Sequence, residues 1–449
     1  MRILGSLLLL SFALPAQELK EPYRAAAQKL IDAALKDEGG MEKMAWLCDR
    51  IGHRLSGSKG YDQAVQWAAE QMKRDGLENV ATPPVKIPHW VRGQESLEMV
   101  EPRRQAIAMM GLGGSVATPK EGITAEVVAA KDFEHLKALG REKVAGKIVF
   151  FDVPFESYRK SVAYRGTGAS AAAKLGAVGM IMRSAGVATR NQPHTGSLRY
   201  EEGVAKVPAA ALGEEDAQLL SRLLSGGVAV KVNLKMEAQT LPDHDSAQVI
   251  GELRGREKPE EVIVIGGHLD SWDAGTGAHD DASGCIAPWQ AVVLMKKLGL
   301  RPRRTIRVVL FANEENGLRG GNAYRAMIGA EIKNHVAAIE MDGGAEKPVG
   351  FGVTANEKAM AQVTAIGALL DPIGAGKITA GGGGADIGPI TREGVPAFGL
   401  RTVGERYWEW HHTAADTLDK IVPEDFRKNI AAIAVMSYVL AEMPERLGQ

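Results

Sequence analysis

Two histidines and four acids lie where apolar segments of the sequence give way to loops. Imidazole and carboxylate ligands without thiolate favour Zn²⁺, with Co²⁺ or Mn²⁺ as substitutes. Two imidazoles and three carboxylates would suit a pair of cations that share one carboxylate, and the fourth acid is then free to move a proton. The sequence therefore predicts a two-metal hydrolase. The six residues are His268, Asp280, Glu314, Glu315, Asp342 and His412.

The spacing of these residues suggests different tasks. Asp280 lies on a glycine-rich loop, and its two oxygens make it the natural bridge between two cations. Glu314 and Glu315 are adjacent, so they cannot both face one ligand from a regular strand. One of them is expected to bind a metal and the other to accept a proton from the attacking water. Asp270 lies two residues after His268 and is expected to orient that imidazole rather than to bind metal.

Strand-like and helix-like segments alternate from residue 246 to the end of the chain. This rhythm predicts an α/β fold with a mostly parallel central sheet flanked by helices, which binds ligands at the carboxyl ends of its strands. The expected strands are 262–265, 306–311, 336–339 and 397–400, and the expected helices are 287–298, 323–328 and 429–442.

A chain of 449 residues is too long for one hydrophobic core. Its character changes over 118–240, where short strands and small-residue helices predict an inserted α+β domain. His135 and His194 stand alone there, so this domain is expected to donate no metal ligand. Residues 17–117 are then the N-terminal part of the main domain, and 241–449 its metal-binding part.

Residues 1–16 have the features of an export signal, which predicts a secreted or periplasmic protein. Their apolar run is shorter than the roughly 20 residues of a spanning helix, so no membrane anchor is expected. A net charge of -1 and few aromatic residues give no support for binding nucleic acid. Cys48 and Cys285 could pair in an exported chain, but a buried free thiol is the favoured state for Cys285.

Five blocks of sequence carry a specific resemblance. The chain resembles the M28 family of co-catalytic zinc exopeptidases over nearly all of its mature length, and within it the carboxypeptidase type. Long motifs in a fixed order are stronger evidence than one short pattern. The blocks are RLSGS at 54–58, IPHW at 87–90, residues 268–281, LGLRP at 298–302 and the histidine pair at 411–412.

The resemblance implies a role for each candidate residue. Glu314 matches the general base, and Asp280 matches the carboxylate that bridges two Zn²⁺ ions per chain. The inserted domain resembles a protease-associated domain, and a homodimer is implied. Short peptides, above all dipeptides, are the implied substrates of a carboxypeptidase or dipeptidase, with an aminopeptidase as the alternative. The residues that match metal ligands are His268, Asp280, Glu315, Asp342 and His412.

Substrate-binding residues are less determined by the resemblance. Many M28 aminopeptidases have a tyrosine just before the last histidine ligand, where this chain has His411. His411 and Tyr407 are therefore candidate donors to the oxyanion. Asp386 follows a glycine run and is expected either to fix that loop or to meet a substrate terminus. His279 is expected to face solvent or substrate.

Two other functions occur on similar folds. One is a peptidase-like receptor that has lost its metals, which the intact ligand set argues against. The other is cyclisation of N-terminal glutamine, which the inserted domain and the bridging ligand pattern disfavour. Metal content would test the first alternative, and product mass the second.

Overall fold

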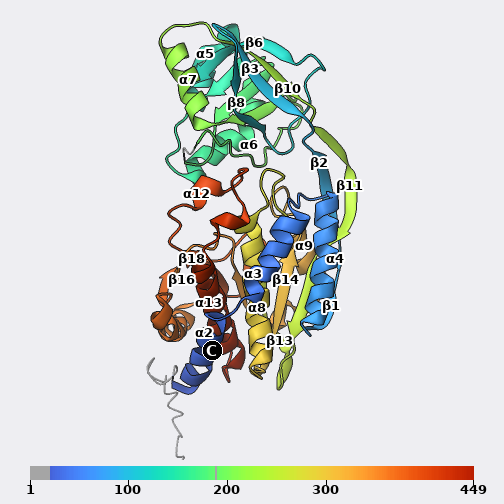
Figure 1. The fold of residues 1–449 in the computed structure, drawn as a ribbon, viewed down its shortest axis with the longest axis vertical. Helices are drawn as coiled ribbons and strands as arrows, with labels where there is room; N and C mark the ends of the chain where they lie inside the picture. The colour runs from blue at the N-terminus through green and yellow to red at the C-terminus, as the bar shows by residue number, and fades with distance from the viewer. Residues whose placement is uncertain (1–20, 188–189) are drawn as a thin grey trace, which may run out of the picture.

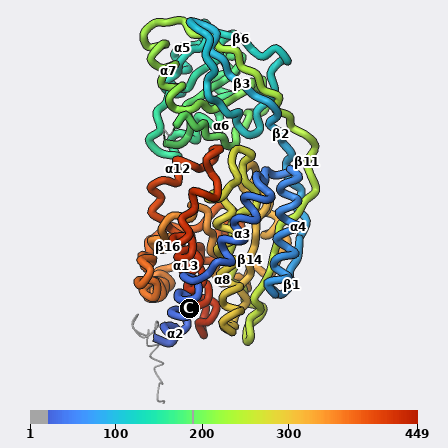
Figure 2. Tube along the Cα trace, in the orientation of Figure 1, coloured from blue at the N-terminus to red at the C-terminus, as the bar shows by residue number. Residues whose placement is uncertain are grey.

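The computed structural model describes residues 21–187 and 190–449, and the expected export signal at 1–16 lies outside them. The molecule is elongated and has two parts stacked along its long axis (Figures 1 and 2). One part, here called the main domain, contains the N-terminal helices and the C-terminal half of the chain. The other, here called the inserted domain, is built by residues 95–236. Helices and strands mix in both parts, as the sequence predicts.

The main domain is built on an eight-stranded sheet in the order β1-β12-β14-β13-β15-β18-β16-β17. The four central strands β14, β13, β15 and β18 are mutually parallel, which confirms the mostly parallel sheet. The strands are β1 (Glu78–Ala81), β12 (Val249–Leu253), β13 (Lys258–His268), β14 (Arg304–Phe311), β15 (His335–Glu340), β16 (Pro348–Thr354), β17 (Lys377–Ala380) and β18 (Ala397–Thr402).

Both faces of this sheet are covered. Along β13, Ile263 and Ile265 face a core shared with α2, α4, α8 and α13, whereas Val262 and Val264 face a second core that includes Tyr324 of α9. Burial on both faces explains the continuous apolar runs. The helices are α2 (Arg24–Ala34), α3 (Gly39–Ala45), α4 (Lys59–Arg74), α8 (Ser283–Lys297), α9 (Arg319–Ile328), α10 (Glu357–Gly367), α11 (Gly388–Thr391), α12 (Tyr407–Trp410) and α13 (Pro423–Glu442).

Helix α4 shows how local sequence defines an element. Its cap residue Ser58 accepts a hydrogen bond from the backbone N–H of Tyr61 at 3.2 Å, and Gly76 follows its end with a positive φ. Buried side chains recur at helical spacing from Tyr61 to Met72 and pack against the sheet. The shorter helical turns are η1 (Glu21–Tyr23), η2 (Trp46–Ile51), η3 (Ala278–Ala282), η4 (Gly329–Asn334), η5 (Ala368–Ile373) and η6 (Leu418–Lys420).

The inserted domain has its own eight-stranded sheet, in the order β4-β3-β10-β6-β7-β8-β9-β5. The sheet separates two hydrophobic cores, each covered by helices. Its strands are β3 (Glu95–Glu101), β4 (Gln105–Ile107), β5 (Met109–Gly111), β6 (Ile123–Ala130), β7 (Ile148–Phe151), β8 (Gly179–Arg183), β9 (Ala209–Leu212) and β10 (Lys231–Met236). Its helices are α5 (Phe133–Val144), α6 (Tyr158–Lys174) and α7 (Glu214–Ser225).

Three strands of this second sheet precede residue 118, where the insertion was expected to begin. Strand β3 pairs with β10 along its length, and β5 pairs with β9 at the opposite edge. We therefore infer that the inserted domain starts near residue 95.

A two-stranded ribbon joins the two domains. Strand β2 (Pro84–Val91) carries the chain into the inserted domain and β11 (Gln239–Ala247) carries it back, and the two pair antiparallel along the edge of the molecule (Figure 1). At the inserted-domain end of the ribbon, Val91 and Gln239 are direct partners.

Cys48 and Cys285 are both free and buried, which agrees with the favoured state of Cys285. Among the helices of the described residues, none is long and apolar enough to cross a membrane.

Candidate metal centre and catalytic cleft

The candidate ligands meet at the carboxyl ends of neighbouring parallel strands. His268 is the last residue of β13 and is in register with Phe311, the last residue of β14. Gly266 of β13 is in register with Glu340, the last residue of β15. Because these strands end at the same edge, the loops after them bring Glu314, Glu315 and Asp342 beside His268.

Asp280 lies between two imidazoles. Its Oδ1 is 3.2 Å from Nε2 of His268, and its Oδ2 is 3.2 Å from Nε2 of His412. Asp342 lies 3.6 Å from the first imidazole, and Glu315 lies 2.9 Å from the second. We call His268 and Asp342 with Asp280 Oδ1 the His268 half, and His412 and Glu315 with Asp280 Oδ2 the His412 half. The structure thus brings all five predicted ligands together.

The Asp280 loop is held by a residue that the sequence did not single out. The carboxylate of Asp416 accepts hydrogen bonds from the backbone N–H groups of His279 at 2.7 Å and Asp280 at 3.1 Å. Burial raises the pKa of Asp416 to about 7, although these two hydrogen bonds oppose the change. Asp416 lies four residues after His412, so one loop supplies a candidate ligand and the support for the bridging aspartate.

Arg54 fixes the segment between His268 and Asp280. Its guanidinium is fully buried and donates to the carbonyls of Leu269 at 2.8 Å, Thr276 at 2.7 Å and Gly277 at 3.1 Å. Only a planar fork of donors can reach such separate acceptors at once. This explains the arginine of the RLSGS block as a support of the metal loop.

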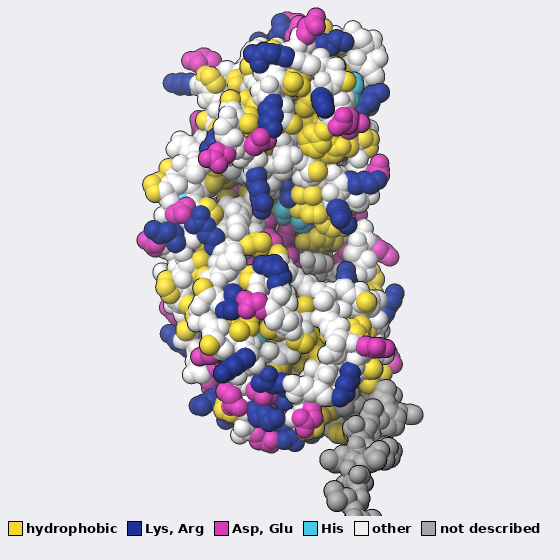
Figure 3. Space-filling model, turned by 180° about the vertical axis from the view of Figure 1, so that it is seen from behind, with side chains coloured by type: hydrophobic (Ala, Val, Ile, Leu, Met, Phe, Trp, Pro, Cys, Tyr) yellow, Lys and Arg dark blue, Asp and Glu magenta, His cyan; other side chains and the backbone are white. Residues whose placement is uncertain are grey.

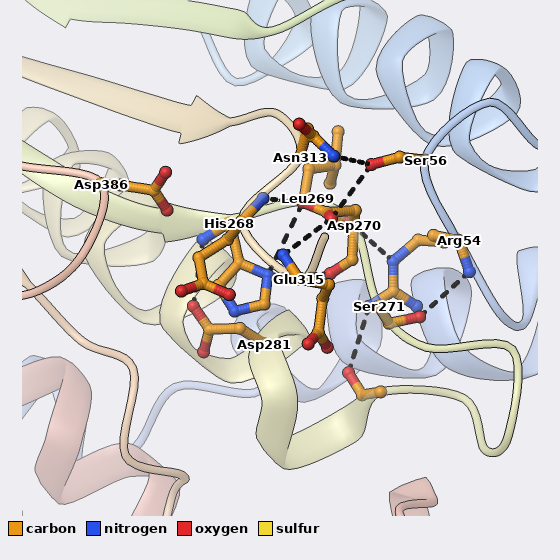
Figure 4. A network of polar contacts seen from close by, with 12 residues as sticks. Arg54, Ser56, His268, Leu269, Asp270, Ser271, Asp281, Asn313, Glu315 and Asp386 are labelled. Atoms are coloured by element: carbon orange, nitrogen blue, oxygen red, sulfur yellow. Dashed lines mark hydrogen bonds and ion pairs between the residues drawn. The ribbon is translucent and has the colours of Figure 1, made fainter. Parts of the chain in front are cut away.

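The carboxylate of Asp270 supports the glutamate pair (Figure 4). It accepts from the backbone N–H groups of Glu314 at 3.0 Å and Glu315 at 3.3 Å, and from the hydroxyl of Ser56 at 3.1 Å. The imidazole of His268 is oriented by the backbone carbonyl of Asp270, 3.0 Å from Nδ1, whereas the carboxylate is farther away at 3.7 Å. Asp270 therefore positions Glu314 and Glu315 through its carboxylate, and His268 through its backbone carbonyl.

The adjacent glutamates diverge, as the sequence argument expected. Glu315 is buried and contacts His412, whereas Glu314 is only partly buried. Burial raises the pKa of Glu315 to about 7 and that of Glu314 well above its ordinary value. Both glutamates border the cleft, and Glu314, the less buried of the two, is the one that a substrate and its attacking water could contact more readily.

A cleft of about 1170 Å³ opens between the two domains, with the candidate centre at its floor. Seen from behind, histidine and acidic side chains are visible in the hollow between the two parts (Figure 3). Tyr158 and Arg199 line it from the inserted domain, and Arg319 and Arg401 from the main domain.

The candidate substrate residues fall in two environments. His411 stacks on His412 with ring centroids 3.6 Å apart, and both His411 and Tyr407 line the cleft. Asp386 is buried and set apart from the centre, and it is not among the residues that line the cleft (Figure 4). Its carboxylate has no hydrogen-bond partner within the described residues.

His279 does not face solvent or substrate, so that prediction is wrong. Its side chain is 1% exposed, stacks on Trp410 with centroids 4.6 Å apart, and accepts a hydrogen bond at Nδ1 from the backbone N–H of Ala345. His279 lies two residues after Gly277 on a loop, which suggested exposure. Trp410 and Ala345, both distant in the sequence, contact its ring and bury it. His279 is a packing residue that helps to fix its neighbour Asp280.

The donor set fits a zinc centre. Within the described residues, His268 Nε2, Asp280 Oδ2 and Glu315 Oε1 are buried without a hydrogen-bond partner, although all three lie in the centre. Burial disfavours the charged form of His268, but Asp280 and Asp342 still raise its pKa well above the ordinary value. Unpaired nitrogen and oxygen donors in one buried cluster are what a divalent cation would satisfy.

Comparison with known families supports the same conclusion. Residues 248–437 match peptidase family M28, and residues 116–220 match the PA domain. The first match contains every candidate ligand. The second falls within the inserted domain.

Individual relatives agree with the family matches. The chain is 40% identical over 437 residues to carboxypeptidase Q of Homo sapiens, covering 96% of this chain and 92% of that protein. A crystal structure of a peptidase M28 precursor from Shewanella amazonensis has a TM-score of 0.91 and 35% identity, covering 96% of this chain and 99% of that one. A zinc aminopeptidase from Bacillus subtilis, with a TM-score of 0.68 and 19% identity over 91% of this chain and 96% of that one, shares the fold.

Proposed function

The chain belongs to peptidase family M28, and from this premise we propose that it is a dinuclear zinc exopeptidase that cleaves dipeptides or short peptides as a carboxypeptidase. The observation that carries the proposal is the position of Asp280, whose two oxygens each lie 3.2 Å from a different imidazole. A carboxylate between two symmetric half-sets suits a bridge between two cations.

The His268 half and the His412 half would each hold one Zn²⁺, with Asp280 shared. When bound, the cations would polarise the scissile carbonyl and make water a stronger nucleophile. The protein supplies the rest: Arg54 and Asp416 hold the bridging loop, and Asp270 fixes the backbone of the glutamate pair. Such preorganisation places the reacting groups without reorganisation during the reaction.

Glu314 is the proposed general base. It stands on the cleft wall, while Asp270 holds its backbone and leaves its carboxylate free to face the substrate. It would accept a proton from the attacking water and return it to the departing amine. His411 and Tyr407 also reach the cleft, and His411 is the proposed donor to the oxyanion because its Nε2 lies 3.6 Å from Asp280.

Metal content tests the dinuclear proposal. Purified protein should contain close to two zinc ions per chain, and a chelator should abolish activity until zinc is restored. Full activity with one ion or none would refute the shared role of Asp280.

A pair of matched variants tests the division of labour between the adjacent glutamates. Glu314→Gln should retain both metals while kcat falls by roughly 10² or more, the usual contribution of a positioned base. Glu315→Gln should lose metal from the His412 half. If the two phenotypes are exchanged, the roles assigned to the two residues are wrong.

Blocked dipeptides test the direction of cleavage. The carboxypeptidase proposal draws on the relative with 40% identity, and it requires a free carboxyl terminus on the substrate. Amidation of that terminus should abolish cleavage, whereas acetylation of the amino terminus should be tolerated better. The opposite pattern would identify an aminopeptidase, and rapid internal cleavage of doubly blocked peptides would exclude both exopeptidase modes.

We also propose that residues 1–16 direct secretion or periplasmic export and that the mature enzyme is a homodimer. The charged start and short apolar run support export. N-terminal sequencing of the exported protein and its sedimentation would test the two statements.

A further inference from the structure

The two candidate imidazole ligands are oriented from different domains. His268 places its Nδ1 3.0 Å from the backbone carbonyl of Asp270, within the main domain. His412 places its Nδ1 3.2 Å from the backbone carbonyl of Thr195, which lies between β8 and β9 of the inserted domain. A metal-binding histidine usually donates its second N–H to such an acceptor, which fixes the ring. The halves therefore differ in what supports them.

The inserted domain contacts the His412 half at further points. The backbone N–H of Thr195 donates to the carbonyl of His412 at 3.0 Å, and the hydroxyl of Ser197 donates to the carbonyl of Glu315 at 2.9 Å. Thus both terminal residues of this half are bound by the short segment 195–197. Across the described residues, no hydrogen bond or ion pair links the inserted domain to His268 or Asp342.

Thr195 is itself anchored from both sides. Its hydroxyl donates to the carbonyl of Gly111 at 2.8 Å and accepts from Arg92 at 3.3 Å. Arg92 forms a bidentate pair with Asp273, at 2.9 and 2.6 Å, and both side chains are largely buried. Asp273 lies on the loop between His268 and Asp280. The hydrogen bonds that hold Thr195 therefore connect it to this loop of the main domain.

A buried cation contacts the same carbonyl. Arg165 of α6 is 7% exposed and donates from Nη1 to the carbonyl of Thr195 at 3.4 Å. The carbonyl oxygen of Thr195 therefore accepts hydrogen bonds from both His412 and Arg165, one for each of its lone pairs. Its position is fixed by the hydroxyl network on one side and by these donors on the other.

We propose that Thr195 is a positioning residue through which the inserted domain completes the His412 half of the metal centre. The inference rests on the proposed dinuclear zinc site. It implies that zinc in this half and the docked position of segment 195–197 stabilise each other, because coupling between two binding events is reciprocal. Zinc in the His268 half should be independent of the inserted domain.

One-site variants allow each half to be measured alone. Asp342→Asn leaves the His412 half, and Glu315→Gln leaves the His268 half. Thr195→Val, introduced into each, removes the anchoring hydroxyl but keeps the backbone carbonyl. In the Asp342→Asn background, Thr195→Val should raise the zinc dissociation constant roughly 10- to 100-fold, the usual effect of changing a group that orients a ligand. In the Glu315→Gln background, the dissociation constant should change little.

A matched control is Thr124→Val, on strand β6 of the inserted domain, where the hydroxyl accepts from Asn233 far from the cleft. This variant should leave both dissociation constants unchanged. Equal weakening of the two halves by Thr195→Val, or no weakening of either, overturns the proposal. Wild-type protein that binds fewer than two zinc ions defeats the dinuclear site itself, which is a distinguishable failure.

Hydrogen exchange provides a readout that does not need the Thr195 variant to fold. The Thr195 amide donates to His412, so its exchange reports the docked segment. Zinc should slow exchange of segment 195–197 in Asp342→Asn and leave it unchanged in Glu315→Gln. Equal protection in both variants would show that this segment does not distinguish the halves.

Discussion

His335 should make the main domain sensitive to acid. The residue starts β15, the strand that leads to Asp342, and its side chain is buried. Its Nε2 lies 2.8 Å from the hydroxyl of Tyr324, and its Nδ1 lies 3.0 Å from the carbonyl of Glu331. Arg307 donates to the same tyrosine at 3.1 Å, so the chain of donors is complete when the imidazole is neutral and accepts from Tyr324.

The size of the effect follows from this environment. Burial lowers the pKa of His335 from 6.5 to about 4. The hydrogen bond to the Glu331 carbonyl opposes this change, and the positive charge of Arg307 adds to it. Since the folded pKa lies below the unfolded one, the unfolded chain binds more protons between these two values. The stability from this group is present above about pH 6.5 and is lost as the pH falls to about 4. At 1.36 kcal/mol for each pKa unit, the loss is about 3 kcal/mol.

Equilibrium denaturation of wild type and His335→Gln, at pH values from 7.5 to 4, measures this contribution. Other titrating groups are common to both proteins and cancel in the difference. The advantage of wild type over the variant should fall by about 3 kcal/mol across that range. His335→Asn, which also lacks a titratable ring, should give the same change. A difference that stays constant with pH would refute the argument, whatever its size at neutral pH.

Three further predictions concern the centre. Arg54→Lys keeps the charge but cannot reach three separate carbonyls, so zinc content should fall and the free energy of unfolding should drop by about 3 kcal/mol. Gly267→Ala would place a Cβ 2.2 Å from Asp281 Oδ2 and should weaken zinc binding, whereas Gly166→Ala, with no atom within 4 Å, should not. Chelation should lower Tm, and zinc at 100 times its Kd should restore about 3 kcal/mol of stability.

The central parallel strands could be predicted because burial on both faces of the sheet requires continuous apolar runs in the sequence. Residues 262–265 form a continuous apolar run, and the structure contains them within β13, buried on both faces. The ligand cluster follows from the same logic. Strand ends of a parallel sheet share one edge, so residues that follow separate strands converge without any further information.

Long-range pairing and packing could not be predicted in the same way. Strand β3 pairs with β10, which lies about 130 residues later in the chain, and the alternation along β3 does not reveal which sheet it joins. His279 was misjudged for a related reason, because Trp410 of helix α12, distant in the sequence, covers its ring. Asp416 lies four residues after the predicted ligand His412, but only the fold shows its carboxylate meeting the backbone of Asp280.

The ribbon of β2 and β11 also has a consequence for how such a protein changes over generations. The chain leaves and re-enters the main domain at neighbouring points, since Val91 and Gln239 are direct partners. A single deletion between them, closed by a two-residue turn, would convert the ribbon into an ordinary hairpin without moving either strand. The inserted domain is therefore a cassette that one recombination event could add, exchange or remove. Exchange of this domain would rebuild the wall of the cleft, and it would also replace the support that segment 195–197 gives to the His412 half.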